Sequence, residues 1–338
     1  MKAMVLNGPS ELALEDVATP KPAAGQVLIR VTHSGICGTD YKIYTGAIPV
    51  RYPRIMGHEM IGEVVEASGG DLRPGQRVII DPELYCGACF HCRIGQTHLC
   101  PKGQLLGRDS NGGFAEFLTA PASHVFALPD AIDNQVAPLI QVLTTCLHAE
   151  RLTPIFPGES VAVLGLGVTG QLHAQIAKAR GASPVIGVTR SADKRELAQK
   201  LGADMTFPGG EEAIQKVRDA TGGRGADVVI DTTGMLPVVA DAIQMVRFGG
   251  RVLLFGIITA KEGALPFYNL YFKEIQVINA RVAKSEDYPA CIDLVQRGLV
   301  KLRPLISNVL PLGELKQAIG MLGSDGGSQR MKIIMEHR

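Results

Sequence analysis

The chain has 338 residues, of which 46% are hydrophobic and 20% charged, with a formal net charge of +1. This composition is typical of a folded protein with room for two domains, and it excludes a disordered or fibrous chain. The N-terminal residues lack a signal-peptide pattern, and no stretch approaches the roughly twenty apolar residues of a membrane span. We therefore expect a cytoplasmic protein without a membrane partner, and the near-zero charge argues against nucleic-acid binding.

The first 150 residues predict a mostly antiparallel, loop-rich β domain. Short alternating or apolar runs are separated there by Gly and Pro. The predicted strands are Gln26–Val31, Ile61–Glu66, Arg77–Asp81 and Phe114–Thr119.

Two short motifs in this region, CGTD at 37–40 and GHEMIG at 57–62, contain side chains that can bind zinc. Cys37, His58 and Glu59 are competent ligands, and an open site with three protein ligands is what a catalytic zinc ion requires. Each residue also has a structural interpretation: a small buried hydrophobe, a hydrogen-bonded core histidine and a surface acid, respectively. The residues alone leave both interpretations open.

Four cysteines follow within fifteen residues: Cys86, Cys89, Cys92 and Cys100. Four tetrahedral thiolates form a closed structural zinc site with no position for a substrate. Disulfides are disfavoured because pairs three residues apart are strained and nothing else indicates an oxidising compartment. The spacing also resembles that of iron–sulfur ferredoxins, although their last interval is three residues and here it is seven. The sequence therefore predicts a structural zinc lobe at 86–100, with an iron–sulfur cluster as the alternative.

After residue 150 the pattern alternates between strands and helices, which predicts right-handed βαβ crossovers and a parallel sheet covered on both faces. The predicted strands are Ser160–Gly165, Pro184–Thr189, Ala226–Asp231 and Arg251–Gly256. The predicted helices are Thr169–Arg180, Ser191–Leu201 and Leu236–Arg247. Beyond residue 285 a helix at Tyr288–Arg297 and strands at Ile306–Leu310 and Met331–Met335 are expected.

A glycine motif directly follows the first strand of this alternating region: Gly165, Leu166, Gly167, Val168, Thr169 and Gly170. The first glycine permits a tight turn, the second lets backbone amides approach a pyrophosphate, and the third brings helix against strand. The helix N-terminus then receives the phosphate charge. The motif in this context predicts a dinucleotide site, with a plain strand-to-helix turn as the alternative.

The end of the second strand of this region indicates which dinucleotide is bound. NAD-binding domains carry an acidic side chain there, roughly 20 residues beyond the glycines. Thr189 stands at this point, and Arg190, followed by Lys194 and Arg195, can pair with a 2′-phosphate. This favours NADP over NAD. The alternative is that these cations are the solvated start of a helix and that Asp193 reaches the ribose.

Together and in this order, the motifs resemble the zinc-containing medium-chain alcohol dehydrogenase family. The resemblance covers essentially the whole chain and includes GHEMIG, LRPGQRV at 72–78, the four cysteines and GLGVTG. The stretches 145–149 and 267–275 look closest to the sorbitol and threonine dehydrogenase branch.

The resemblance implies an α/β architecture with a GroES-like catalytic domain at 1–150, a Rossmann domain at 151–285 and a return to the catalytic domain at 286–338. Cys37, His58 and Glu59 match the catalytic zinc positions, and the four-cysteine lobe matches the structural zinc. Thr39 matches the hydroxyl that passes the substrate proton outward. The positions that match the nicotinamide side are Phe255, Gly256, Ile257, Asn279 and Ala280. A homodimer or homotetramer is implied.

Two positions depart from the family pattern. Gln141 stands where the sorbitol dehydrogenase branch has a glutamate, and a neutral amide is a poor zinc ligand. Either Glu59 completes the site, or Cys146 helps, or the metal is weakly held. With one anionic ligand fewer, zinc retains more positive charge and polarises an oxygen more strongly. Lys42 replaces a proton-relaying histidine, and an ammonium relays protons only if its pKa is lowered.

The expected function is a zinc-dependent oxidoreductase that transfers hydride between a primary or secondary alcohol, or a polyol, and NADP(H). A zinc-free NADPH quinone or enoyl reductase of the same superfold, and a non-catalytic NADPH-binding protein, are the alternatives. The specific alcohol is not indicated by any spacing in the sequence.

Overall fold

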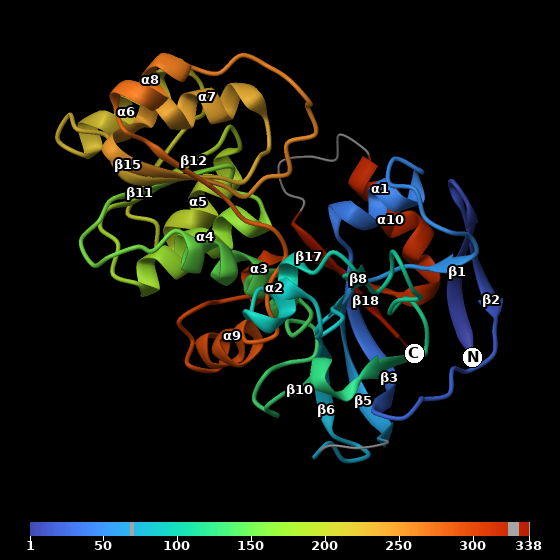
Figure 1. The fold of residues 1–338 in the computed structure, drawn as a ribbon. Coiled ribbons are helices and arrows are strands. Elements are labelled where there is room, and N and C mark those ends of the chain that lie inside the picture. The colour runs from blue at the N-terminus through green and yellow to red at the C-terminus, as the bar shows by residue number, and fades with distance from the viewer. Residues whose placement is uncertain (68–70, 324–330, 338) are drawn as a thin grey trace. The chain divides into compact units, whose positions relative to one another are not determined.

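The computed structural model describes residues 1–67, 71–323 and 331–337, which form two compact units (Figure 1). The first unit comprises Met1–Thr144, Lys284–Gln296 and Ile306–Arg338, and the second comprises Thr145–Ala283 and Arg297–Leu305. The domain limits expected at 150 and 285 stay a prediction, and residues 324–330 and 338 of the expected C-terminal segment lie outside the described residues. Within the described ranges, no helix is long and apolar enough to cross a membrane.

Antiparallel sheets form the framework of the first unit. Its strands are β1 (Lys2–Gly8), β2 (Glu11–Asp16), β3 (Gln26–Gly35), β4 (Arg54–Ile55), β5 (Glu59–Ala67), β6 (Arg77–Ile80), β7 (Glu83–Leu84), β8 (Gln104–Leu105), β9 (Phe117–Pro121), β10 (Val125–Ala127), β17 (Ile306–Pro311) and β18 (Lys332–Glu336). The largest sheet has the order β10-β6-β5-β3-β18-β17, and β9 also pairs with β3. Among its described residues only β17 and β18 pair in parallel. The short pair β7–β8 closes the base of the cysteine lobe.

Helices cover this framework and place the site residues. They are α1 (Gly38–Tyr44), α2 (Phe90–Arg93), α9 (Asp287–Gln296) and α10 (Leu315–Gly323), and α3 (Leu139–Leu152) begins in this unit. One apolar core lies between the strands of the large sheet and includes Ile29, Met60 and Ile80. A second joins α1 and α10 to the sheet β2-β1-β4 through residues such as Ile43 and Leu315.

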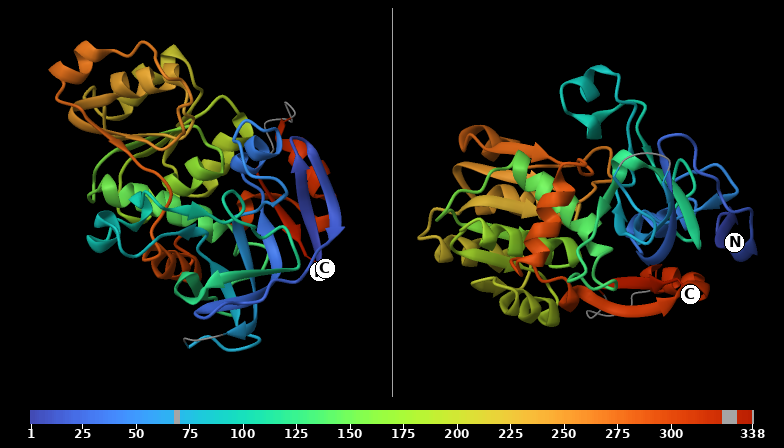
Figure 2. Two further views of the ribbon diagram at one scale, coloured as in Figure 1. Left: turned by 45° about the vertical axis from the view of Figure 1, so that its right-hand side comes forward. Right: turned by 90° about the horizontal axis from the view of Figure 1, so that it is seen from below.

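The second unit is built on a six-stranded parallel sheet (Figure 2). Its strands are β11 (Val161–Leu164), β12 (Val185–Val188), β13 (Met205–Phe207), β14 (Ala226–Asp231), β15 (Val246–Leu254) and β16 (Gln276–Asn279). Their order, β13-β12-β11-β14-β15-β16, is 3-2-1-4-5-6 in chain order, which is the dinucleotide-binding arrangement.

Alternate residues of these strands face opposite helix layers. The helices are α4 (Val168–Ala179), α5 (Ala192–Lys200), α6 (Glu211–Ala220), α7 (Leu236–Met245) and α8 (Phe267–Phe272). Val161 and Val163 pack in a core with α4 and α5, whereas Ala162 and Leu164 pack with α6 and α7. Because side chains alternate along a strand, this near-continuous apolar sequence fits a sheet buried on both faces.

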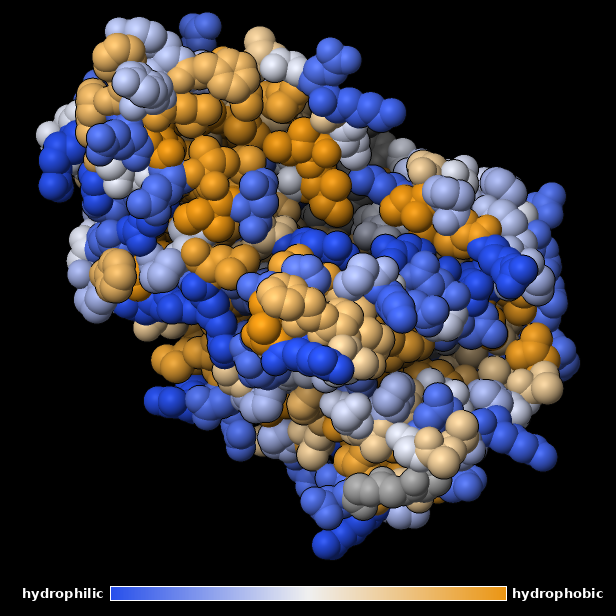
Figure 3. All heavy atoms as spheres, in the orientation of Figure 1, coloured by the Kyte–Doolittle hydropathy of each residue, from blue (hydrophilic) through white to orange (hydrophobic). Residues whose placement is uncertain are grey.

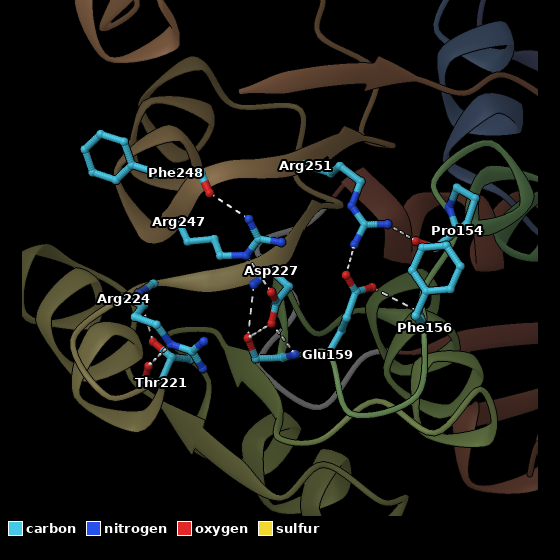
Figure 4. A network of polar contacts seen from close by, with 11 residues as sticks. Pro154, Phe156, Glu159, Thr221, Arg224, Asp227, Arg247, Phe248 and Arg251 are labelled. Atoms are coloured by element: carbon cyan, nitrogen blue, oxygen red, sulfur yellow. Dashed lines mark hydrogen bonds and ion pairs between the residues drawn. The ribbon is translucent and has the colours of Figure 1, made fainter. Parts of the chain in front are cut away.

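A polar network fastens the amino ends of the central strands (Figure 4). The backbone N–H and hydroxyl of Ser160 donate to Asp227 at 2.8 and 2.6 Å, and Arg247 donates to the same carboxylate at 2.5 Å. Arg251 pairs with Glu159 and stacks over Phe156, 5.7 Å from the ring centre. These contacts hold the edge of the sheet opposite the glycine motif.

The fold class predicted from sequence is confirmed, and two of the predicted elements differ from the structure at their ends. The helix expected at Leu236–Arg247 ends at Met245, because Val246 begins β15 and pairs with Ala226. The strand expected from Phe114 begins at Phe117, because the Phe114 N–H donates to the carbonyl of Met56 instead.

Candidate functional site

The four cysteines of the lobe lie as a tetrahedral cage. The Sγ–Sγ distances are 4.0 Å for Cys86–Cys92, 3.5 Å for Cys89–Cys92, 3.9 Å for Cys89–Cys100 and 3.5 Å for Cys86–Cys100. Sulfurs at about 2.3 Å from a central zinc lie about 3.8 Å apart, whereas a disulfide requires about 2.05 Å. The donor set therefore fits one zinc ion.

Without a cation, the pKa values of Cys86 and Cys92 move in opposite directions. Backbone N–H groups of Ala88 and Cys89 lower the pKa of Cys86 to about 6, whereas desolvation and its hydrogen bond with Cys89 raise the pKa of Cys92 to about 12. A divalent cation would remove this conflict by stabilising every thiolate.

Local structure brings the CGTD and GHEMIG motifs together. Cys37 is the residue before α1, and its N–H donates to the Asp40 carboxylate at 2.8 Å, which fixes the helix start. Gly57 has a φ of +95°, and a Cβ there would lie 2.9 Å from the Phe114 ring. Gly62 lets β5 pass close to β3, since its Cβ would meet the Arg30 carbonyl at 2.3 Å. Glycines at both ends of the motif therefore position the intervening His and Glu.

The ligand atoms of Cys37, His58 and Glu59 all lie within 4.8 Å of one another. His58 and Glu59 are buried, and Cys37 is partly buried. Thiolate, imidazole and carboxylate are the donor types that zinc accepts, and three such ligands leave one position for a substrate oxygen. The cluster fits a catalytic zinc ion.

Asp40 and Lys332 surround this cluster. His58 Nδ1 lies 3.4 Å from Asp40 Oδ1; burial by itself lowers the pKa of His58, but the charges of Asp40 and Cys37 outweigh it and raise the pKa well above its ordinary value. Lys332 donates to both carboxylate oxygens of Glu59 at 2.8 and 2.7 Å. Burial opposes the charge of Lys332, but Glu59 raises its pKa overall.

The other predicted catalytic residues are distributed around α1 and α3. Thr39 and Lys42 lie on α1 and are half-buried. Gln141 lies in the first turn of α3 with 7% of its surface exposed, and its carbonyl accepts the Thr144 hydroxyl at 2.6 Å. Cys146 belongs to the second unit, where its Sγ lies 3.9 Å from the Thr169 carbonyl oxygen. In the described part of the chain, the metal-ligand cluster contains Glu59 but not Cys146.

The glycine motif forms the turn between β11 and α4. Gly165 has a φ of +86°, and a Cβ on Gly170 would lie 1.9 Å from the Gly165 carbonyl oxygen. Gly167 is the residue before α4, and Leu166 is buried against the sheet. Thr232 donates to the carbonyls of Leu164 and Gly165 at 3.0 and 2.9 Å, which holds the turn in place.

A cavity of about 330 Å³ opens at the carboxyl ends of the parallel strands. It is lined by Leu164 and Gly165 at the end of β11, Val188 to Arg190 at the end of β12, Gly209, Gly210 and Ala213 at α6, and Thr233, Met235, Val238, Asp241 and Met245 at α7. Ligands of doubly wound folds bind at this edge of the sheet.

The basic residues after β12 have different environments. Arg190 is exposed and lines the cavity, whereas Arg195 donates to the carbonyls of Thr189 and Arg190, both at 2.8 Å. The Lys194 N–H donates to the Ser191 hydroxyl at 3.4 Å, so α5 has a side-chain cap. Arg190 alone of these cations lines the cavity among the described residues.

The positions expected beside the nicotinamide follow β15 and β16. Phe255 packs edge-on against His173, with ring centres 4.7 Å apart, and Gly256 lies against Gly234, where a Cβ would meet a backbone nitrogen at 2.1 Å. Ile257 is 74% exposed. Asn279 ends β16 and is exposed, and Ala280 is partly buried in the sheet core.

Family models match both units. Residues 23–130 match the alcohol dehydrogenase GroES-like domain, and residues 168–297 match the zinc-binding dehydrogenase model. L-threonine 3-dehydrogenase of Pyrococcus abyssi is 36% identical over 87% of each chain. The chain belongs to the zinc-containing medium-chain alcohol dehydrogenase family.

Other members of this family differ in the cofactor that their names print. An NAD-dependent alcohol dehydrogenase of Sulfolobus acidocaldarius is 34% identical and covers 98% of this chain and 100% of its own. A zinc-binding dehydrogenase of Sinorhizobium meliloti, solved bound to NADP, has a TM-score of 0.93 at 30% identity, covering 99% and 98% of the two chains.

Sequence reasoning missed three residues of these sites. Asp40 was visible within CGTD, and its position three residues after Cys37, the residue before α1, was the available signal. Lys332 gave no signal, because its partner Glu59 is 273 residues away. Asp241 enters the cavity only because α7 turns that face toward the strand ends.

Proposed function

We propose that the chain is a zinc-dependent dehydrogenase that interconverts a primary or secondary alcohol, or a polyol, with its carbonyl product, and that it prefers NADP(H). The observation that carries the proposal is the convergence of Cys37, His58 and Glu59 within 4.8 Å. Family membership supports oxidoreductase chemistry with zinc and a nicotinamide cofactor. A zinc-free reductase would not require the cluster of Cys37, His58 and Glu59 or the cysteine cage.

The side chains around the cluster prepare it for an alcohol. Bound zinc would act there as a Lewis acid that lowers the pKa of a substrate hydroxyl. Asp40 orients His58, and Lys332 offsets the charge of Glu59. Thr39 takes the substrate proton outward, and Lys42 or water completes its exit. A bound nicotinamide would supply the hydride acceptor for the oxidative direction.

The cysteine cage serves structure rather than chemistry in this proposal. Its four sulfurs are all engaged with one another at zinc-like spacing, which leaves no position for a substrate. Each chain would therefore hold two zinc ions, one in the cage and one at Cys37 and His58.

Cofactor choice rests on Arg190. A guanidinium at the end of β12 can pair with the 2′-phosphate of NADP, and Thr189 offers no carboxylate for the ribose of NAD. Phe255, Gly256, Ile257, Asn279 and Ala280 are proposed to contact the nicotinamide half. Relatives with either cofactor exist, so the preference depends on this chain's own residues.

A homodimer or homotetramer is proposed from the exposed apolar side chains of α8 and β16. Phe267, Tyr268, Tyr271 and Phe272 are 54–79% exposed, and Figure 3 shows hydrophobic side chains gathered on this unit. β16 is the edge strand of the parallel sheet. A second copy would cover both the apolar helix and the unpaired edge.

The test combines metal analysis with activity. Two zinc ions per chain are expected, and Cys37→Ser or His58→Ala should lose one zinc and activity by about 10³-fold or more while dinucleotide binding survives. Cys291→Ser is the same change at a buried position on α9, and it should retain the full zinc content and the activity. Turnover that persists in Cys37→Ser and His58→Ala would refute the zinc chemistry.

One panel of activity assays tests both the substrate class and the cofactor preference. Polyols, short diols, aliphatic and aromatic alcohols and threonine are assayed with NADP and NAD in parallel. Arg190→Ala should raise KM for NADP about tenfold with little change for NAD, whereas Lys200→Ala, paired with Glu196 on α5, should change neither. A wild-type preference for NAD would overturn the Arg190 argument.

A further inference from the structure

One face of α7 lines the cavity at the strand ends. Met235 precedes the helix, and Val238, Asp241 and Met245 follow at intervals of three, three and four residues, the spacing of one helical face. Three of these side chains are apolar, and across the cavity Leu164, Val188 and Ala213 add further apolar walls. Such walls suit a flat, largely apolar ring. The carboxylate of Asp241 on the same face is therefore unexpected.

The Asp241 carboxylate is poorly compensated in its surroundings. In the described ranges no side chain makes a hydrogen bond or ion pair with it, and the Glu211 carboxylate repels its charge. Burial first, and then Glu211, raise the pKa of Asp241 above its ordinary value. A hydrogen-bond donor on a ligand would relieve both effects.

The cavity has a basic side and an acidic side. Arg190 lines it after β12 and supplies a cation, whereas Asp241 and the nearby Glu211 make the α6–α7 side acidic. A molecule that fits needs an anion or hydroxyls for Arg190, an apolar ring for the walls, and a donor for Asp241. The adenosine half of a dinucleotide has this pattern, because its ribose lies beside a base that carries an exocyclic amino group.

We propose that Asp241 reads the base of the cofactor by accepting a hydrogen bond from the 6-amino group of adenine. This inference rests on the proposed nicotinamide dinucleotide function and adds the residue that selects the base. An ionised carboxylate only accepts hydrogen bonds. If the base carries an oxygen at position 6 instead of the amino group, that oxygen and the carboxylate are both acceptors and cannot form a hydrogen bond with each other. Selectivity therefore follows from the donor at position 6.

The experiment compares NADP with its hypoxanthine analogue, which has a carbonyl oxygen at position 6, by direct titration of the full zinc-loaded protein. Wild type should bind the adenine form about tenfold more tightly. Asp241→Asn should lose this preference, because its amide can donate to the oxygen. Asp219→Asn, which removes an exposed charge from α6, is the matched control and should keep the wild-type ratio. Asp241→Ser provides a second variant that loses the acceptor charge.

Each outcome separates the inference from the proposed function. Equal binding of the two forms by wild type, or an unchanged ratio in both Asp241 variants, overturns the role of Asp241 while the dehydrogenase proposal stands. Failure of wild type to bind either dinucleotide overturns the proposed function and the inference with it. A ratio that falls in both Asp241 variants and not in Asp219→Asn supports the assignment.

Discussion

The buried pair of Glu59 and Lys332 gives the sharpest prediction about the catalytic unit. The two side chains are 1% and 6% exposed, and Lys332 contacts both carboxylate oxygens. Removing one member of a buried ion pair costs about 3–5 kcal/mol, because the other charge stays buried without a partner. Lys332→Met should therefore destabilise the zinc-free protein by that amount, which lowers the melting temperature by roughly 10 °C for a unit of this size.

A double-mutant cycle isolates the pair. Glu59→Gln alone should also destabilise, since it leaves the Lys332 ammonium buried, whereas the double variant Glu59→Gln/Lys332→Met should recover most of the loss. Thermal melts of the four proteins after chelation provide the measurement. If Lys332→Met and the double variant melt together, the charge imbalance is not the cause, and the reasoning is refuted.

Zinc adds a second readout to the same cycle. In Lys332→Met the carboxylate loses its lysine partner and can pair with the metal instead, so added zinc should stabilise this variant more than wild type. Equal stabilisation of wild type and Lys332→Met by zinc would show that Lys332 does not compete for Glu59.

Three further predictions concern other parts of the molecule. Cys100→Ser should reduce the zinc content from two ions to one per chain and lower the melting temperature, and an unchanged zinc content by elemental analysis would contradict the cage. Burial raises the pKa of Asp81 to about 6 from an ordinary 3.8, so folded protein holds this proton more tightly than unfolded protein. Stability should then fall by about 3 kcal/mol as the pH rises from 4 through 6, and Asp81→Asn should flatten this fall; parallel urea-unfolding profiles of the two proteins would refute it. Phe272→Glu on α8 should convert the proposed assembly to monomers, and an unchanged mass by light scattering would exclude this surface.

The sequence predicted the parts of the molecule that are encoded locally. The turn at Gly165 and the close contact at Gly170 follow from residue type and spacing, because only glycine tolerates a φ of +86° or a Cβ position 1.9 Å from a carbonyl oxygen. The cysteine cage is equally local, since its ligands lie within fifteen residues and one short strand pair closes its base. Both could therefore be read before the fold was known.

The remaining parts depend on long-range pairing that spacing does not encode. Lys332 appears in the sequence as an ordinary cation near the C-terminus, and it faces Glu59 only because β18 pairs with β3, which pairs with β5. The hairpin β1–β2 was missed because its strand β2 is mostly exposed and carries little apolar signal. Such features depend on strand order, which local patterns leave undetermined.

The charges around Cys37, His58 and Glu59 bear on Gln141, which the resemblance places where the sorbitol branch carries an acid. Cys37 and Glu59 are the two acidic side chains of the cluster, and Lys332 pairs with Glu59 at 2.7 Å. A glutamate at position 141 would be buried, since Gln141 is 7% exposed, and a buried carboxylate is costly unless it is paired. The neutral amide avoids this cost before a metal binds, and it would leave a bound divalent ion with more net positive charge than a glutamate would. If the proposed zinc ion binds this cluster, Lys332 and Gln141 would both leave it with more positive charge, which is expected to weaken its retention and to strengthen its polarisation of a substrate oxygen.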